Sequence, residues 1–176
     1  RVTTNGALSI IGSFNPTNFG SSSRGTLVEY TNGVFYGTSF YSPSDQAGSL
    51  FRVTTNGGLT RITTFSSYNG PRYPQGALLI GGDGALYGTT IQGGPHFGGT
   101  VFRVTTNGSL AVLFSFDGFV NGQSPAAGLT IGHDGKFYCT TSFGQGYGGT
   151  IFSLDTSSRF QSLSATGQNR VLSLSG

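Results

Sequence analysis

Carboxylates are the first groups in this sequence that could do chemistry, because two of them placed across a glycosidic bond form the machinery of most glycoside hydrolases. The 176-residue chain has six acidic residues, Glu29, Asp45, Asp83, Asp117, Asp134 and Asp155. Asp83 and Asp134 precede glycines at matching points of a repeat, as turn geometry explains. Glu29 stands where sister segments carry Ile80 and Ile131, and we interpret it as an edge adaptation rather than a base. The sequence therefore predicts no catalytic residue and no enzyme activity.

Histidine and cysteine do not suggest a metal site or a nucleophile. His96 and His133 fall in different parts of the repeat and on opposite expected faces, so we do not expect them to share a metal or form a triad. Cys139 is the single cysteine; it replaces Gly37 and Gly88, and we expect a small buried residue. The sequence predicts no cofactor and no metal, and one cysteine leaves the redox compartment open.

A third set of side chains suits binding. Aromatic rings mixed with amide, carboxylate and guanidinium groups suit a sugar, which stacks its C–H face while its hydroxyls take hydrogen bonds. The candidate ligand-binding residues are Tyr41, Asp45, Tyr68, Arg72, Tyr73, His96, Phe97, Phe119, Gln123, Gln145 and Tyr147. The alternative is that these rings pack glycine-rich loops onto the ends of strands. Both interpretations stay open at the level of sequence.

These residues are positioned by a tandem repeat with a period of 51 residues. The sequence Arg-Val-Thr-Thr-Asn-Gly begins at Arg1, Arg52 and Arg103, and a fourth copy begins at Ile151, one residue short of register. A fixed period of this size indicates units that bury apolar surface against their neighbours. The predicted repeats within residues 1–163 are 1–51, 52–102, 103–152 and a partial copy from 153, while 164–176 form a closing strand or begin a following segment.

Composition favours a folded chain without a nucleic-acid or membrane partner. Charged residues are only 9 %, yet 13 % aromatic residues and regularly spaced aliphatic ones argue against disorder. The nine Lys and Arg residues are thinly spread, so the net charge of +3 does not indicate a nucleic-acid surface. No apolar run reaches the length of a membrane span, and no signal peptide is present. Because the chain starts in mid-repeat without Met, a signal or further repeats could have been removed.

One repeat, residues 77–116, predicts four strands. Residues 78–80 are a short apolar run, 86–91 are rich in β-formers, 100–105 alternate apolar and polar, and 110–116 complete the set. Asn107-Gly108 predicts a type I′ hairpin turn. Four strands per unit of about 50 residues is the pattern of a β-propeller blade. The rival is a stacked β-solenoid, but its coils are usually shorter and lack two hairpin turns each.

Alternating strand direction sorts the connections by face. The Thr-Asn-Gly and Asp-Gly turns fall on one side and are nearly identical between copies. The longer connections, which vary between copies, fall on the other side at 15–24, 40–47, 66–75, 92–98, 117–126 and 142–148. Loops on a rigid scaffold carry function more often than strands do. We therefore expect the long-loop face to be the binding face.

The repeat resembles a known family. Its unit contains Gly-Thr-Val-Phe-Arg-Val-Thr-Thr-Asn-Gly at 99–108, Leu-Phe-Ser-Phe at 113–116 and Asp-Gly-Lys-Phe-Tyr at 134–138. These segments are similar to the GloVer tandem repeat, with its G-T-V-F-x-(L/V)-T core, and the likeness extends to about residue 163. The resemblance implies bacterial secreted or cell-surface proteins and a propeller fold, and it implies no established activity.

The number of blades raises the question of partners. Four-strand sets are expected at 26–65, 77–116 and 128–163, and residues 1–14 are expected to add two more strands, which makes about three and a half blades. Natural rings need roughly four to eight. We expect a homo-oligomer or further blades of a longer chain, because exposed strand edges recruit other chains.

Three functions follow from these observations. The first is a non-enzymatic extracellular recognition or adhesion module whose long-loop face binds a partner such as a carbohydrate. The second is structural self-assembly of a surface ring or filament through blade edges. The third is an enzyme resembling the propeller lyases, which would need a cluster of His, Glu and metal that the sequence does not offer.

Overall fold

The protein is built from β-strands joined by turns and loops. The structure is a computed structural model and describes residues 4, 6–15, 17, 20–42, 46–65, 69–118, 120–144, 148–155, 160–163 and 170–172. Every regular element in those residues is a strand, which confirms the all-β prediction. The same residues contain no helix that is long and apolar enough to cross a membrane.

Sheet 1 shows the organisation that the other sheets repeat. It consists of β1 (Ser21–Ser23), β2 (Val28–Thr31), β3 (Val34–Tyr41), β4 (Ser49–Thr54) and β5 (Leu59–Thr64). Strands β3, β4 and β5 are antiparallel neighbours, and the short strands β1 and β2 both pair with β3. β1 and β2 therefore occupy the same row beside β3, as two pieces of one interrupted strand, which we call the first row.

Sheets 2 and 3 follow the same plan. Sheet 2 contains β6 (Pro71–Pro74), β7 (Leu79–Ile80), β8 (Leu86–Gly93), β9 (Thr100–Val104) and β10 (Leu110–Ser115), with β6 and β7 both paired to β8. Sheet 3 contains β11 (Thr130–Ile131), β12 (Phe137–Thr140), β13 (Ile151–Leu154), β14 (Phe160–Ser162) and β15 (Arg170–Leu172). The expected strand sets at 26–65, 77–116 and 128–163 are thus confirmed, and β15 pairs with β14 as a further antiparallel strand.

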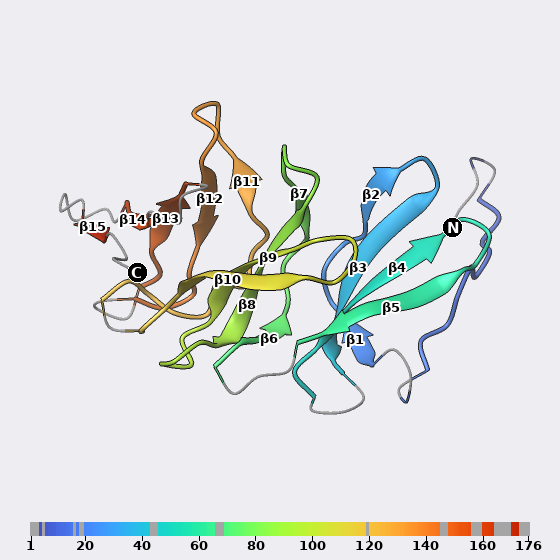
Figure 1. Ribbon diagram of the computed structural model, residues 1–176, viewed down its shortest axis with the longest axis horizontal. Helices are drawn as coiled ribbons and strands as arrows, with labels where there is room; N and C mark the ends of the chain where they lie inside the picture. The colour runs from blue at the N-terminus through green and yellow to red at the C-terminus, as the bar shows by residue number, and fades with distance from the viewer. Residues whose placement is uncertain are drawn as a thin grey trace.

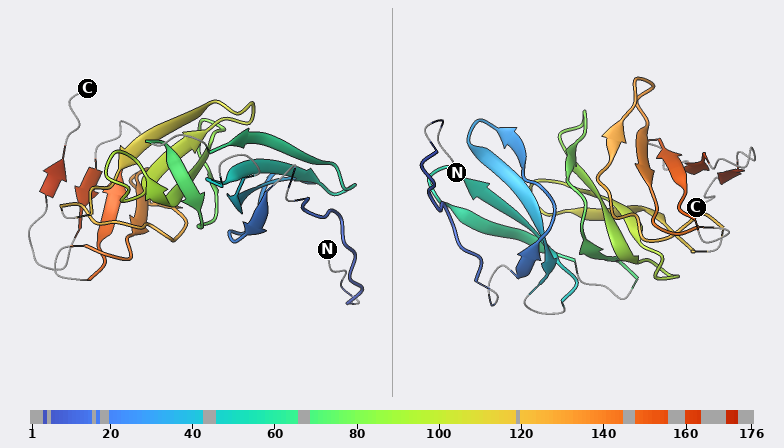
Figure 2. Two further views of the ribbon diagram at one scale, coloured as in Figure 1. Left: turned by 90° about the horizontal axis from the view of Figure 1, so that it is seen from below. Right: turned by 180° about the vertical axis from the view of Figure 1, so that it is seen from behind.

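The sheets stand side by side and share two apolar layers (Figures 1 and 2). Between sheets 1 and 2, buried Tyr36, Leu50 and Phe65 pack with Leu86 and Phe102. The layer between sheets 2 and 3 is its counterpart one repeat later and includes Tyr87, Val101, Phe116, Phe137 and Phe152. Each sheet therefore buries its apolar face against its neighbour, as the repeat predicts.

The turn after β9 differs from the prediction. A type I′ turn requires positive φ at both central residues, and at this turn only Gly108 has it, with φ 94°. The Gly108 amide donates to the Thr105 carbonyl at 2.9 Å, and the Thr105 amide donates to the Ser109 carbonyl at 3.0 Å. This is a three-residue connection in which glycine takes the left-handed position, and Thr54 to Gly58 repeats it. The type I′ prediction was therefore wrong, because Asn107 does not adopt positive φ. Its side-chain oxygen instead accepts a hydrogen bond from the Thr105 hydroxyl.

Two further expectations differ from the structure. Residues 1–3 and 5 lie outside the described part of the chain, and the other residues of 1–14 form no named strand, so the described residues form three sheets where about three and a half blades were expected. The described sheets form an open row (Figure 1). The predicted loops at 15–24 and 66–75 each contain a short strand, β1 and β6, because both segments extend the first row of their sheets.

Candidate binding site at the long-loop end

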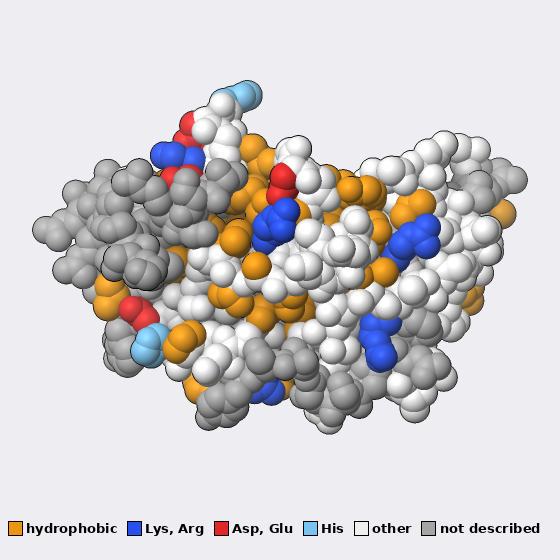
Figure 3. Space-filling view, viewed as in Figure 1, with side chains coloured by type: hydrophobic (Ala, Val, Ile, Leu, Met, Phe, Trp, Pro, Cys, Tyr) orange, Lys and Arg blue, Asp and Glu red, His pale blue; other side chains and the backbone are white. Residues whose placement is uncertain are grey.

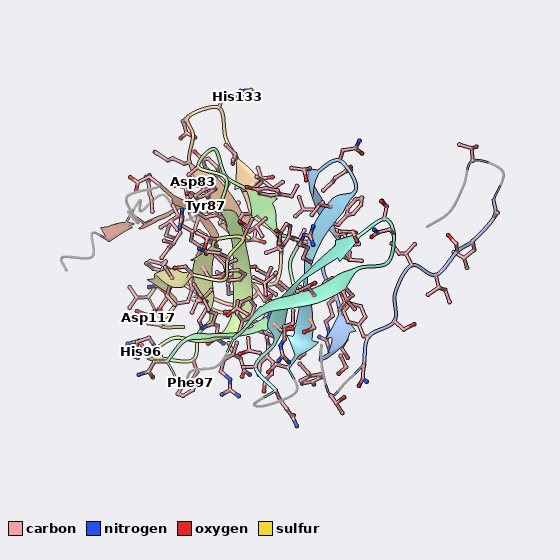
Figure 4. All side chains as sticks on the ribbon, turned by 45° about the vertical axis from the view of Figure 1, so that its right-hand side comes forward. Asp83, Tyr87, His96, Phe97, Asp117 and His133 are labelled. Atoms are coloured by element: carbon pink, nitrogen blue, oxygen red, sulfur yellow. The ribbon has the colours of Figure 1, made fainter. Side chains whose placement is uncertain are left out.

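The molecule has two distinct ends. The Asp-Gly turns lie at one end, which we call the turn end, and the variable connections lie at the other, the loop end. Figure 4 places His133, Asp83 and Tyr87 toward the turn end and Asp117, His96 and Phe97 toward the loop end. The two histidines are therefore far apart, as their positions in the repeat predicted.

Adjacent sheets are joined at the loop end by a repeated backbone hydrogen bond. The Tyr73 amide donates to the Ala47 carbonyl at 2.8 Å, and one repeat later the Ser124 amide donates to the Gly98 carbonyl at 2.7 Å. Tyr73 and Ser124 have φ of 60° and 55°, in the left-handed region that non-glycine residues rarely adopt. We call these contacts the first joint (Ala47, Tyr73) and the second joint (Gly98, Ser124). Recurrence shows that the strain belongs to the scaffold and is not itself a mark of function.

The first joint carries a compact group of aromatic rings. Phe40 stacks on Tyr73 with centroids 4.9 Å apart and an interplanar angle of 17°. Tyr41 meets both rings edge-on, with its centroid 4.9 Å from Phe40 and 5.9 Å from Tyr73. Phe40 is buried, whereas Tyr41 and Tyr73 are partly exposed. The inner ring thus supports two rings that reach the surface.

Two arginines complete this group. The guanidinium carbon of exposed Arg24 lies 3.8 Å from the centre of the Phe40 ring, and that of Arg72 lies 5.2 Å from the centre of Tyr73. Arg72 also donates to the Tyr73 hydroxyl at 3.4 Å. We call these five residues, Arg24, Phe40, Tyr41, Arg72 and Tyr73, the aromatic–arginine cluster. It presents two cations and two tyrosine hydroxyls beside two partly exposed rings, which is chemistry for an anionic, hydroxyl-rich ligand.

The second joint has the same backbone but different side chains. The residues at the cluster's positions are Gln75, Ile91, Gln92, Gln123 and Ser124. Here the Ser124 hydroxyl donates to the Ile91 carbonyl at 3.2 Å. No described residue at these positions is aromatic or charged. The scaffold therefore repeats while its surface chemistry changes, as expected for positions that carry specificity.

The predicted site residues divide between several places. Tyr41, Arg72 and Tyr73 come together in the cluster, while His96 and Phe97 lie in the connection from β8 to β9, with Phe97 40 % exposed. Gln123 belongs to the second joint, where it forms a β-bridge with Phe143. The remaining predicted residues, Asp45, Tyr68, Phe119, Gln145 and Tyr147, lie outside the described residues.

Two corrections concern how the cluster is built. Arg72 and Tyr73 are not loop residues, because they belong to strand β6. Arg24 and Phe40 were not predicted as site residues, although both differ from their counterparts in the other copies. Aligning the copies could have found them, since the Phe40 position holds Ile91 in the second copy.

The charged residues at the turn end have structural partners. Arg103 donates to Asp83 from two nitrogens, at 2.8 and 2.7 Å, and the Tyr87 hydroxyl donates to the same carboxylate at 3.0 Å. The arginine hydrogen bond is the main cause that lowers the Asp83 pKa. Asp134 accepts from the Tyr138 hydroxyl at 2.8 Å, and this bond is the main cause that lowers the Asp134 pKa. Both acids also accept backbone amides two residues on, which supports their prediction as turn residues.

The remaining reactive groups are dispersed. Cys139 is 7 % exposed, and burial raises the pKa of its thiol, so the residue is part of the core as predicted. Within the described residues, no three side chains among His, Cys, Asp and Glu are grouped closely enough to hold a metal ion. Figure 3 shows basic side chains scattered singly over the visible face.

Comparison with known proteins identifies the repeat. No curated protein matches the chain. The family model described as the Gloeobacter/Verrucomicrobia repeat matches residues 1–171, nearly the whole sequence. That range includes the aromatic–arginine cluster and all of the three sheets except Leu172, the last residue of β15. The chain therefore belongs to the Gloeobacter/Verrucomicrobia (GloVer) repeat family.

Proposed function

We propose that the protein is a non-enzymatic extracellular recognition or adhesion module, and that its aromatic–arginine cluster binds acidic carbohydrate. The observation that carries the proposal is the packing of Arg24 over Phe40 and of Arg72 beside Tyr73 at the loop end. A sugar ring can stack on an exposed tyrosine face, while its carboxylate or sulfate accepts hydrogen bonds from guanidinium groups. Neutral sugars would use only the first of these interactions.

The charges at the site indicate which class of carbohydrate would bind, namely an acidic one. Two guanidinium groups flank the rings, and the described residues of the cluster contain no carboxylate. Rings alone would favour neutral sugars, which rely on stacking and hydroxyl hydrogen bonds. The arginines add attraction for anions and a bidentate geometry that matches carboxylate or sulfate. A uronic-acid or sulfated polymer is therefore the ligand class that fits best.

We further propose that the three sheets are blades of a β-propeller. Four or five antiparallel rows per sheet, apolar layers between neighbouring sheets and hairpin turns at one end favour this architecture. The binding face would then be the loop end of the blades.

A glycan array that includes neutral, uronic-acid and sulfated oligosaccharides tests the proposal. We expect signals for the acidic members and their loss in Tyr41→Ser, because Tyr41 is one of the two partly exposed rings on which a sugar could stack at the first joint. Gln92→Ser is the matched control, since Gln92 holds the same position at the second joint. An array without hits, or equal loss in both variants, would reject the first joint as a carbohydrate site.

A further inference from the structure

The two terminal sheets have outer faces that no other sheet of the described residues covers. On sheet 1, the face turned away from sheet 2 contains a hollow of about 210 Å³ whose lining includes Phe14, Leu27, Phe51 and Leu59. All four of these side chains are apolar. On sheet 3, strand alternation turns Lys136, Tyr138 and Ile151 to the face opposite Phe137 and Phe152, which pack against sheet 2. We call these surfaces the head face (sheet 1) and the tail face (sheet 3).

Exposed apolar residues on both faces hold positions that are buried elsewhere in the repeat. Leu27 on the head face is 46 % exposed, whereas its counterparts Leu78 and Leu129 are each 7 % exposed. Ile151 on the tail face is 52 % exposed, and its counterparts, Leu50 and Val101, are fully buried between sheets. The counterparts of head-face residues pack against the counterparts of tail-face residues in both apolar layers. The two outer faces are thus the separated halves of one repeated interface.

We infer that a second copy of this chain docks head-to-tail, with the tail face of one copy covering the head face of the other. Contacts already seen inside the chain predict the contacts of this interface. Tyr87 packs on Phe137 with ring centroids 4.6 Å apart. The residues at the same repeat positions are Tyr138 on the tail face and Phe35 on the head face. Phe35 is partly exposed in the single chain, so a ring partner can reach it.

Charge complementarity supports this pairing. On the head face, exposed Glu29 replaces Ile80, which packs against the layer between sheets 1 and 2. On the tail face, Lys136 replaces Val34, which borders the same layer from the other sheet. The two departures from an apolar repeat are therefore an acid and a base, at positions whose counterparts Ile80 and Val34 border one apolar layer from opposite sheets. In the single chain, Glu29 accepts the Gly33 amide at 3.0 Å and Lys136 lies 3.6 Å from Asp134, so each side chain has its present partner within its own turn.

The phenylalanine at the edge of the interface is complementary as well. Phe65 and Phe116 follow the outer strands of sheets 1 and 2 and contact a phenylalanine of the next sheet. The sequence has Thr166, not Phe, at the corresponding position after β14. Phe14 of the head face contacts Phe51 in the equivalent way. The head face thus supplies the phenylalanine that the third repeat does not encode.

Head-to-tail contacts generate a ring when the rotation closes. Two copies with three sheets each would give six sheets, within the range of roughly four to eight blades of natural propellers. We therefore infer a closed dimer with two identical interfaces. Each interface would contain one Glu29 and one Lys136.

Charge reversal tests the inference. The molar mass is measured by light scattering and sedimentation equilibrium for the unaltered chain and for the E29K and K136E variants. We expect a dimer for the unaltered chain and about tenfold or more weaker association for each variant, because each reversal places like charges opposite each other. The double variant E29K/K136E restores the opposite charges and should recover the dimer. His133→Glu, which adds an acid at the exposed turn nearby, is the control and should associate normally.

Mixing the two single variants gives the most specific result. In a closed head-to-tail dimer of one E29K chain and one K136E chain, both interfaces pair opposite charges, so the mixture should dimerise when neither variant does alone. Thermal melts establish that each variant is folded, and Glu29→Gln and Lys136→Gln provide milder changes if a reversal unfolds the chain. A monomeric unaltered chain, single variants that associate as it does, or a mixture that remains monomeric would each overturn the inference.

Discussion

Phe14 and Phe51 meet edge to face, with ring centroids 4.9 Å apart. The equivalent pairs in the following repeats are Phe65–Phe102 at 5.0 Å and Phe116–Phe152 at 5.1 Å. The environments differ, because Phe65 and Phe116 are fully buried while Phe14 is 39 % exposed. One contact is thus made three times, twice inside the row of sheets and once at its uncovered face.

This difference predicts unequal contributions to stability. Phe65→Ala should lower the free energy of unfolding by about 3–5 kcal/mol, because it leaves a cavity between sheets 1 and 2. Phe14→Ala should cost about 1 kcal/mol, since its ring is only partly removed from water. Urea unfolding followed by tyrosine fluorescence measures both, at a concentration where the chain is monomeric. Equal losses would mean that Phe14 is as firmly packed as its counterparts.

Backbone strain at the loop end predicts a stabilising substitution. Gln46 is exposed and has φ of 57°, a conformation that costs a residue with a side chain but not glycine. Gln46→Gly should raise the free energy of unfolding by about 0.5–1 kcal/mol, and Gln46→Ala should not. Thermal and urea melts of the two variants decide the matter. A destabilised glycine variant would show that the Gln46 side chain has a stabilising role that outweighs the strain.

The turn-end ion pair predicts how stability depends on pH. The Asp83 pKa is lower in the folded chain than in the unfolded one, chiefly through Arg103. The carboxylate therefore adds stability at pH values above its unfolded pKa of about 3.9, and this contribution disappears as the pH falls through the folded pKa. Asp83→Asn should flatten the loss of stability between about pH 5 and 2, and Arg103→Gln should shift the loss to higher pH. Profiles that match the unaltered chain would show that the bonded carboxylate does not affect folding.

Cys139 provides a probe of the layer between sheets 2 and 3. Its thiol is buried with a raised pKa, so the reactive thiolate is scarce in the folded state. A thiol reagent such as DTNB should react at least about a hundredfold more slowly with the folded chain than with the chain in urea. The rate in increasing urea should rise together with unfolding. Rapid labelling without urea would mean that sheets 2 and 3 separate readily.

The fold was largely predictable from the sequence because equivalent residues of the repeats occupy similar positions in their sheets. The apolar run at 78–80, the alternation at 100–105 and the glycine turns all led to the observed strands, and Cys139 was correctly predicted to be buried. The sequence did not predict strand β6 in the interrupted first row of sheet 2. Its segment, Pro71–Pro74, contains two prolines, which favour a loop. Its pairing with β8 depends on contacts within the whole sheet, which a short window of sequence does not contain.

The candidate site was only partly predictable. Aromatic residues in variable segments pointed to Tyr41 and Tyr73, and the structure brings these two rings together. The roles of Arg24 and Phe40 depend on a joint between two sheets, which places residues distant in sequence side by side. The positive φ that orients Tyr73 also has no signature in the residue type.

The most direct test of the proposed function is isothermal titration of the chain with an oligogalacturonate, using a neutral cello-oligosaccharide as the control. We expect binding of the acidic oligosaccharide that weakens with added salt, because the arginine contacts are screened. Arg72→Ala and Arg24→Ala should each weaken it by about tenfold, the loss typical of one charge-assisted contact, while Gln123→Ala at the second joint should not change it. Binding that is equally strong for the neutral sugar, or that survives both arginine substitutions, would contradict recognition of acidic carbohydrate by this cluster.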